Sequence, residues 1–132
     1  MMTLLNRDNI LNAVDMTTEM VEVPEWGGSV MVKGLTGAER DRFESSIVER
    51  AGKKTKMNMS NIRARMVALA VVDENGKRLF RYADVEALGQ KSAAALDRIF
   101  DVAMSLSGMR DEEVEELIEN FTSDPSESST SA

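Results

Sequence analysis

Residues 18–33 show a strand-like pattern on both sides of a turn. Apolar residues occupy every second position in two short stretches, at Val21, Val23, Val30 and Val32. A period of two places such residues on one face of a β-strand. Between the stretches lies the sequence Pro-Glu-Trp-Gly-Gly, in which proline lacks an amide donor and the glycines tolerate positive φ. The pattern therefore predicts a β-hairpin over residues 18–33.

Other segments have the spacing of amphipathic helices. Thr36 and Glu39 have the spacing of a capping box, and apolar residues then recur at helical intervals as far as Ala51. Gly52 follows and is suited to the end of a helix. Similar patterns and capping residues predict helices over residues 6–14, 36–51, 60–70, 84–88 and 92–107, with Gly108 ending the last of them.

A second, smaller hairpin is predicted after residue 70. Val71 and Val72 are β-branched, and the four residues that follow, Asp-Glu-Asn-Gly, contain the Asn-Gly turn signal. We expect the chain to return through Leu79 and Phe80. The basic cluster at residues 53–56 follows a glycine and precedes polar residues, so we interpret it as a solvated loop between two helices.

The last part of the sequence is acidic. Residues 111–121 predict an amphipathic helix whose apolar positions at i, i+3, i+4 and i+7 lie opposite five glutamates. These apolar positions are Val114, Leu117, Ile118 and Phe121. Residues 122–132 consist of Ser, Thr, Asp, Glu and Pro with a single Ala and no large apolar residue, so they do not offset their ordering entropy by burial. We expect them to form a disordered tail.

Together these patterns predict an α+β fold, a mainly helical small domain with one or two short β-hairpins. We divide the chain into a domain over residues 1–110, an acidic amphipathic helix over residues 111–121 and a disordered tail over residues 122–132. The length of 132 residues suits one domain, and 42% apolar content supplies its core.

The composition excludes most common catalytic devices. The sequence has no cysteine and no histidine, which removes disulfides, thiol nucleophiles, the usual zinc ligands and imidazole acid–base chemistry. The sequence Asp-Glu-Asn-Gly at residues 73–76 lacks the twelve-residue ligand pattern of a calcium loop. Gly27-Gly28 is not followed by the Gly-Lys-Ser/Thr of a phosphate-binding loop. We therefore predict no catalytic residue, no metal site and no cofactor, and a protein that is not an enzyme.

Charge is distributed unevenly along the chain. Residues 1–110 hold all 16 basic residues and 15 acidic ones, a net +1, whereas residues 111–132 hold eight acids and no base, a net −8. Such acidity disfavours binding to phosphate backbones, so we predict no nucleic-acid partner. No apolar run approaches the roughly 20 residues that span a bilayer, and the N-terminus lacks the features of a signal peptide. We therefore predict no membrane partner and a cytoplasmic location.

Surfaces for protein partners remain as candidate sites. Trp26 at the tip of the first hairpin has a side chain that often anchors interfaces, or it folds back onto the core. Met16 and Met20 have flexible side chains suited to varied apolar partners, or they fill gaps in the core. The apolar side of helix 111–121 covers a partner, a second copy or its own domain.

The order and spacing of several motifs resemble one known family. They are Val21-Glu22-Val23-Pro24-Glu25-Trp26-Gly27-Gly28, Gly34-Leu35-Thr36-Gly37-Ala38-Glu39-Arg40-Asp41, Val72-Asp73-Glu74-Asn75-Gly76-Lys77-Arg78-Leu79-Phe80, Asp84-Val85-Glu86-Ala87-Leu88-Gly89 and Ala95-Leu96-Asp97-Arg98-Ile99-Phe100. Across roughly residues 7–121, the chain resembles the tail assembly chaperones of siphophages, which have long non-contractile tails, and of related prophages. Relatives often have a serine before the last acidic helix, where this chain has Arg110.

The resemblance implies a non-enzymatic role in virion assembly. Such chaperones bind the tape measure protein in the host cell cytoplasm, keep it soluble until the tail tube polymerises, and are absent from the mature virion. A programmed frameshift commonly yields a longer product that recruits the tail tube protein, and this chain is similar to the short form. A long helical client exposes more apolar surface than one small domain covers, so many copies must bind along it. We therefore also expect self-association into oligomers.

Two other functions remain open on the sequence. The chain would also suit a small structural head-tail or tube-associated protein that is retained in the virion. Alternatively, it is an antitoxin-like regulatory binding module, in which the acidic helix neutralises a basic partner. Mass spectrometry of purified virions separates the chaperone from the structural protein, because the chaperone should be missing there. The neighbouring reading frame separates the chaperone from the antitoxin, because a long helical frame favours the chaperone and a short basic one favours the antitoxin.

Overall fold

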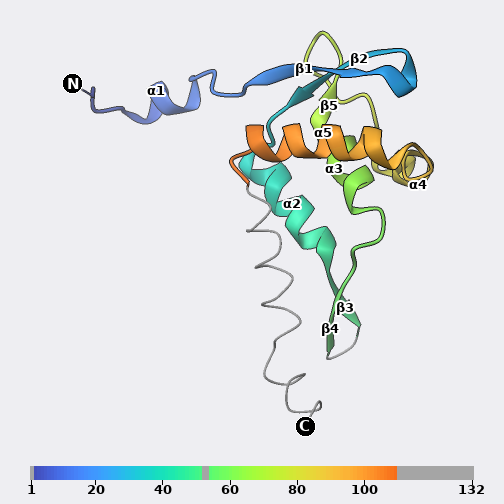
Figure 1. The fold of residues 1–132 in the computed structure, drawn as a ribbon. Coiled ribbons are helices and arrows are strands. Elements are labelled where there is room, and N and C mark those ends of the chain that lie inside the picture. Colours follow the sequence, from blue (N-terminus) through green and yellow to red (C-terminus); the bar gives the residue numbers. More distant parts are fainter. Residues whose placement is uncertain (1, 52–53, 110–132) are drawn as a thin grey trace.

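A computed structural model describes residues 2–51 and 54–109 and confirms a small α+β fold (Figure 1). The strands β1 (Thr18–Val23) and β2 (Gly28–Lys33) form the expected hairpin, with Gly27 at φ 75° in its turn. A third strand, β5 (Val71–Val72), pairs antiparallel with β2. The sheet order is therefore β1-β2-β5, and among the described residues β1 is hydrogen-bonded to a strand along one edge only.

Five helices accompany the sheet among the described residues. They are α1 (Arg7–Leu11), α2 (Gly37–Ile47), α3 (Ile62–Ala70), α4 (Val85–Leu88) and α5 (Ala93–Leu106), with short 3-10 turns at Pro24–Trp26 and Tyr82–Asp84. Figure 1 shows α5 crossing beneath the sheet, with α3 beside it and α2 on the side away from the sheet. The segment containing α1 extends away from this body (Figure 1).

The strand register gives the sheet two different faces. Val21 lies opposite Val30, and this face packs against α5. Met20 lies opposite Met31, and this row lies on the face away from the helices. A buried valine at every second position therefore fixes which residues of β1 and β2 remain open to partners.

The core is centred on α3. This helix is buried over all its residues except Arg63, because α2, α4 and α5 all pack around it. We predicted a helix over residues 60–70 with one apolar face, but its central position requires apolar residues on every side. Phe43 from α2 and Phe100 from α5 contact each other across the core, with ring centroids 6.4 Å apart.

The expected helix caps are present. The Thr36 hydroxyl accepts from the Glu39 amide at 3.1 Å, and the Glu39 carboxylate accepts from the Thr36 amide at 2.9 Å, which confirms the capping box. Asn6 caps α1, and Ser92 caps α5. Gly108 follows α5 with φ 70°, a conformation that favours glycine.

The helix predicted over residues 36–51 is too long. The structure ends α2 at Ile47 and continues into a hairpin of β3 (Val48–Ala51) and β4 (Lys54–Met57). Val48 is already extended at φ −97° and ψ 118°. Because the hairpin includes Lys54–Met57, most of the basic cluster is strand and not the loop between helices that we predicted.

The second hairpin is also different from the prediction. The turn after residue 72 is present, with the Gly76 amide donating to the Asp73 carbonyl at 3.0 Å. However, β5 also pairs with β2, and the returning chain, which is described throughout, forms no strand of its own. It contributes a bridge between Val72 and Arg78 and backbone bonds from the Leu79 amide to Val71 and from the Asp73 amide to Lys77. A strand of two residues gains more from joining an existing sheet than from an isolated hairpin.

The N-terminal helix is shorter than expected, spanning Arg7–Leu11 where we predicted residues 6–14. The predicted acidic helix 111–121 and tail 122–132 lie outside the described residues. Within the described part of the chain, no helix has the length and apolar character needed to cross a bilayer.

Candidate functional site

The face of the sheet that points away from the helices carries two of the candidate residues. Met20, in the middle of β1, is 64% exposed, and Met31 lies directly opposite it on β2. Met16 is 39% exposed and precedes Thr17, whose carbonyl still accepts from the Gly34 amide at 3.1 Å. We refer to Met16, Met20 and Met31 as the open face. Its thioether side chains are flexible and make this surface apolar.

The tip of the hairpin is fixed to α5 by an ion pair. Arg98 on α5 donates from both terminal nitrogens to the Glu25 carboxylate, at 2.9 and 3.0 Å. The hydrogen bond from Arg98 lowers the pKa of Glu25 to about 2. A bidentate arginine–carboxylate contact is more directional than a contact through one hydrogen bond, so it orients the hairpin on the helices.

Trp26 lies at this tip and is half-buried. Its side chain packs against the edge of the core, which leaves part of the indole at the surface. The position is therefore intermediate between the two interpretations of the sequence. A rigid, partly exposed aromatic side chain has a low entropic cost when it is covered by a partner.

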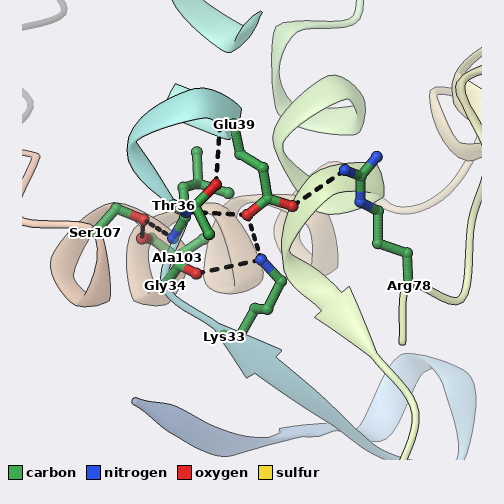
Figure 2. A network of polar contacts seen from close by, with 8 residues as sticks. Lys33, Gly34, Thr36, Glu39, Arg78, Ala103 and Ser107 are labelled. Carbon is green, nitrogen blue, oxygen red and sulfur yellow. Dashed lines mark hydrogen bonds and ion pairs between the residues drawn. The ribbon is translucent and has the colours of Figure 1, made fainter. Parts of the chain in front are cut away.

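A buried polar network holds the other end of the hairpin (Figure 2). Lys33 at the end of β2 is ion-paired with Glu39 on α2, and Arg78 contacts the other oxygen of Glu39 at 3.2 Å. Burial raises the pKa of Glu39, but the hydrogen bonds from Lys33 and the Thr36 amide and the two positive charges outweigh this, so the pKa is lowered. Both charges of the central pair are nearly enclosed, so the network has a structural role.

The same region is joined to the end of α5. The Ser107 hydroxyl accepts from the Leu35 amide at 2.8 Å and donates to the Ala103 carbonyl at 2.6 Å (Figure 2). Gly34 is so close to α5 that a Cβ atom there would lie 2.6 Å from the Leu106 carbonyl oxygen. The strand β2, the start of α2 and the end of α5 therefore form one rigid junction.

The second buried charged residue, Arg65, also has structural contacts. Its guanidinium donates to the carbonyl of Ser46 at 2.8 Å, to that of Asn58 at 2.6 Å and to that of Ser60. These bonds join α3 to the end of α2 and to the chain that follows the β3–β4 hairpin. Within residues 2–51 and 54–109, no group of three or more acidic, cysteine or histidine residues is arranged to hold a metal ion.

These features define a small α+β domain whose hairpin is held to the helices at both ends and carries apolar side chains on its outer face. A search of protein-family models identifies this class further: the model described as "Phage tail assembly chaperone" matches residues 7–119. The chain therefore belongs to the phage tail assembly chaperone family. The family is one of assembly chaperones and not of enzymes, as the composition predicted.

A solved structure has a similar fold. The tail assembly chaperone of bacteriophage HK97 matches with a TM-score of 0.53 at 16% identity, over 75% of this chain and 94% of that chain. At this identity the match shows the fold alone. A search of curated proteins found no match.

Sequence analysis missed the half-buried Met31 and some exposed apolar residues near the N-terminus. Met31 stands between Val30 and Val32, and the alternation that placed both valines inward already placed Met31 on the opposite face. Leu4 and Leu5 were not singled out, yet they are 95% and 59% exposed. The candidate residues Val114, Leu117, Ile118 and Phe121 lie outside the described residues.

Proposed function

We propose that this protein binds the tape measure protein of a siphophage or prophage and keeps it soluble before the tail tube polymerises. In this proposal the chaperone acts in the host cell cytoplasm and is absent from the mature virion. The observation that carries the proposal is the open face, where Met20 on β1 and Met16 just before it are exposed and Met31 is half-buried, in a chain that belongs to the tail assembly chaperone family.

The proposed client explains why the contact surface is apolar and shallow. A long amphipathic helix exposes apolar stripes whose side chains differ from turn to turn, and methionine adapts to such variation better than a deep pocket does. Each copy covers a short length of client, so many copies bind side by side and associate with one another. Weak individual contacts also allow tube subunits to displace the chaperone.

Other candidate residues extend this proposed surface. Trp26 would contact the client from the tip of the hairpin. Helix 111–121 would contribute the apolar positions Val114, Leu117, Ile118 and Phe121 to the client or to a neighbouring copy. A test is the double variant Leu117→Asp/Phe121→Asp, which we expect to lose client solubilisation or self-association while circular dichroism shows a folded domain. Global unfolding would instead assign this helix to the core.

The main experiment is coexpression with the tape measure protein. We expect the client to be recovered in the soluble fraction only when this chain is present. The variant Met16→Glu/Met20→Glu should abolish this recovery, because carboxylates on the open face would have to be desolvated against an apolar stripe.

The matched control is Gln90→Glu/Ala94→Glu. It adds the same charge to exposed residues away from the sheet and leaves the open face unchanged. This control should retain client recovery. Loss of recovery in both variants would attribute the effect to charge alone, and retention in both would contradict the role of the open face.

We also propose that a frameshift-extended form recruits the tail tube protein. This proposal is supported by the family and by the Ser-rich sequence after Thr122, where a change of reading frame would fall.

Mass spectrometry of purified virions separates the chaperone from a retained head-tail or tube-associated protein, because only the latter is found in the particle. Binding to a short basic protein encoded alongside would favour the antitoxin-like alternative.

A further inference from the structure

Exposed large apolar side chains gather in separate places on this molecule. Apart from the open face and Met59, they lie in an N-terminal segment or beside one pocket. The first group is Met2, Leu4, Leu5, Ile10, Leu11 and Val14. The second is Tyr82, which lines the pocket, and Leu79, which lies between the lining residues Arg78 and Phe80 in the sequence. We refer to residues 2–15 as the arm and to the second place as the Tyr82 pocket. Each is apolar, and neither covers the other in the structure.

The arm makes no packing contact that would explain its shape. Every residue of the arm is exposed, and α1 buries no residue. A helix of five residues is far below the length of about 12–15 residues at which isolated helices become marginally stable in water. Figure 1 shows the arm directed away from the body of its own chain. An arm with six exposed large apolar side chains therefore needs an external surface to cover it.

The Tyr82 pocket offers such a surface. It has a volume of about 180 Å³ and lies between α2, α3 and the chain around the second 3-10 turn. Its apolar wall includes Phe43, Leu69, Phe80 and Tyr82. A cavity of about 150 Å³ lined by apolar residues is large enough to hold benzene. The pocket therefore accepts one side chain of the size of leucine or isoleucine.

The charges around the two surfaces are complementary. Arg42 and Arg78 line the pocket and are exposed at the surface, and Arg78 also contacts Glu39 at 3.2 Å. The arm carries Asp8 and Asp15 on either side of the exposed Ile10, Leu11 and Val14. An apolar side chain entering the pocket would thus bring an aspartate towards an arginine. Such pairs contribute more to orientation than to affinity.

We infer that the arm of one copy binds the Tyr82 pocket of a second copy of this chain. Because arm and pocket are different surfaces, the contact is head-to-tail and each bound copy still presents one free arm or one free pocket. Repetition of this contact gives an open row of chaperones. The inference deepens the proposed function, on which it rests for its purpose, because it names the contact that aligns copies along a client.

The test uses the purified full chain without any client, in analytical ultracentrifugation over a range of concentrations. We expect the wild-type chain to associate and two variants to remain monomeric: Leu5→Asp/Leu11→Asp in the arm and Leu79→Asp/Tyr82→Asp at the pocket. Their association should be weaker by at least about tenfold, as for loss of an interface anchor. All four residues are more than half exposed, so the variants should stay folded by circular dichroism.

Mixing the two variants makes the test directional. The arm variant keeps an intact pocket and the pocket variant keeps an intact arm, so the mixture should form a dimer and nothing larger. The matched controls are Thr3→Asp/Asn12→Asp in the arm and Gln90→Asp/Ala94→Asp on the body, all at exposed polar or small residues. Both controls should associate like the wild type.

A chemical cross-link provides a second measurement. The sequence has no cysteine, so Leu11→Cys and Tyr82→Cys each introduce a single thiol. A short bis-maleimide should join the two single variants to each other more readily than either to itself. A monomeric wild type, a mixture that stays monomeric, or a link formed within a chain carrying both cysteines would overturn the inference. If the arm variant is monomeric but still solubilises the client, the proposed function stands. If only the open-face variant loses client solubilisation, the contact between arm and Tyr82 pocket stands.

Discussion

Glu39 is contacted from three separate parts of the chain. Lys33 comes from the end of β2, Arg78 from the segment after β5, and the Thr36 amide from the start of α2. The side chain of Glu39 is 10% exposed and that of Lys33 is 14% exposed. In such an enclosed pair each charge depends on the other, since removing one leaves the second desolvated without compensation.

We expect Glu39→Gln to lower the free energy of unfolding by about 3 kcal/mol, the low end for breaking a buried ion pair, because Arg78 is partly open to water. Glutamine retains the capping box, so the loss reports on charge. Urea unfolding followed by circular dichroism measures it. The control Glu44→Gln removes an exposed i,i+4 pair with Arg40 and should cost no more than about 0.5 kcal/mol. Equal losses of unfolding free energy in the two variants would mean that the buried network stabilises the fold no more than the Arg40–Glu44 pair does.

Two glutamates predict how stability depends on pH. The pKa of Glu25 is lowered from 4.5 to about 2, and that of Glu39 is also lowered. Below pH 4.5 the unfolded chain therefore binds more protons than the folded one, so stability falls as pH falls towards 2. Thermal unfolding should show a constant Tm from neutral pH to about 5 and a decrease below it. The decrease should be smaller in Glu25→Gln, and an identical curve would contradict this assignment.

At the scale of elements, Gly34 sets how closely the β2–α2 junction approaches α5. A Cβ at this position would lie 2.6 Å from the Leu106 carbonyl oxygen, which is backbone and does not move aside. We expect Gly34→Ala to destabilise the fold by about 1 to 3 kcal/mol through overpacking. Chemical unfolding of the purified variant measures this loss.

Gly37→Ala serves as the control for this prediction. Gly37 begins α2 only three residues later, and a Cβ there would meet nothing within 4 Å. This substitution should leave stability unchanged or raise it by about 0.5 kcal/mol, because alanine restricts the unfolded chain. If both variants were neutral, the close approach at Gly34 would have no energetic consequence.

Local signals in the sequence predicted most elements. The alternating valines gave the β1–β2 hairpin, and Thr36, Glu39 and Ser92 gave the helix starts, because caps and period-two patterns act over a few residues. The pairing of β5 with β2 joins residues about forty positions apart and has no local signal. The end of α2 was misplaced because Ala51 continues the helical spacing, while Val48 is equally suited to a strand.

The candidate site was predictable to a similar extent. Met16 and Met20 were predicted as candidates because methionine has a flexible apolar side chain, which is evident from residue type alone. The structure places both at the surface. Met31 required the register of the hairpin, and the Tyr82 pocket required three segments that meet only after folding. The buried environments of Glu39 and Arg65 likewise depend on long-range packing, which spacing along the chain does not encode.

At the scale of the whole molecule, the proposed function predicts a stoichiometry. One small domain covers only a few hundred Å² of an exposed apolar stripe, so copy number should follow client length. A tape measure protein whose helical region is duplicated in tandem should bind about twice as many copies. Light scattering of the soluble complex measures this ratio. A fixed ratio for both clients would indicate one specific site and contradict coating along the length.

The sheet has one further property at this scale. Apart from its pairing with β2, the described part of the chain leaves the outer edge of β1 without a neighbouring strand. Such an edge is a template for fibre growth unless it is short or charged. β1 is six residues long and carries Glu19 and Glu22, so an identical strand docking there would gather four carboxylates in one narrow ribbon. In the assembly of many copies that we propose, these charges would disfavour edge-to-edge pairing of β1 strands from neighbouring chains.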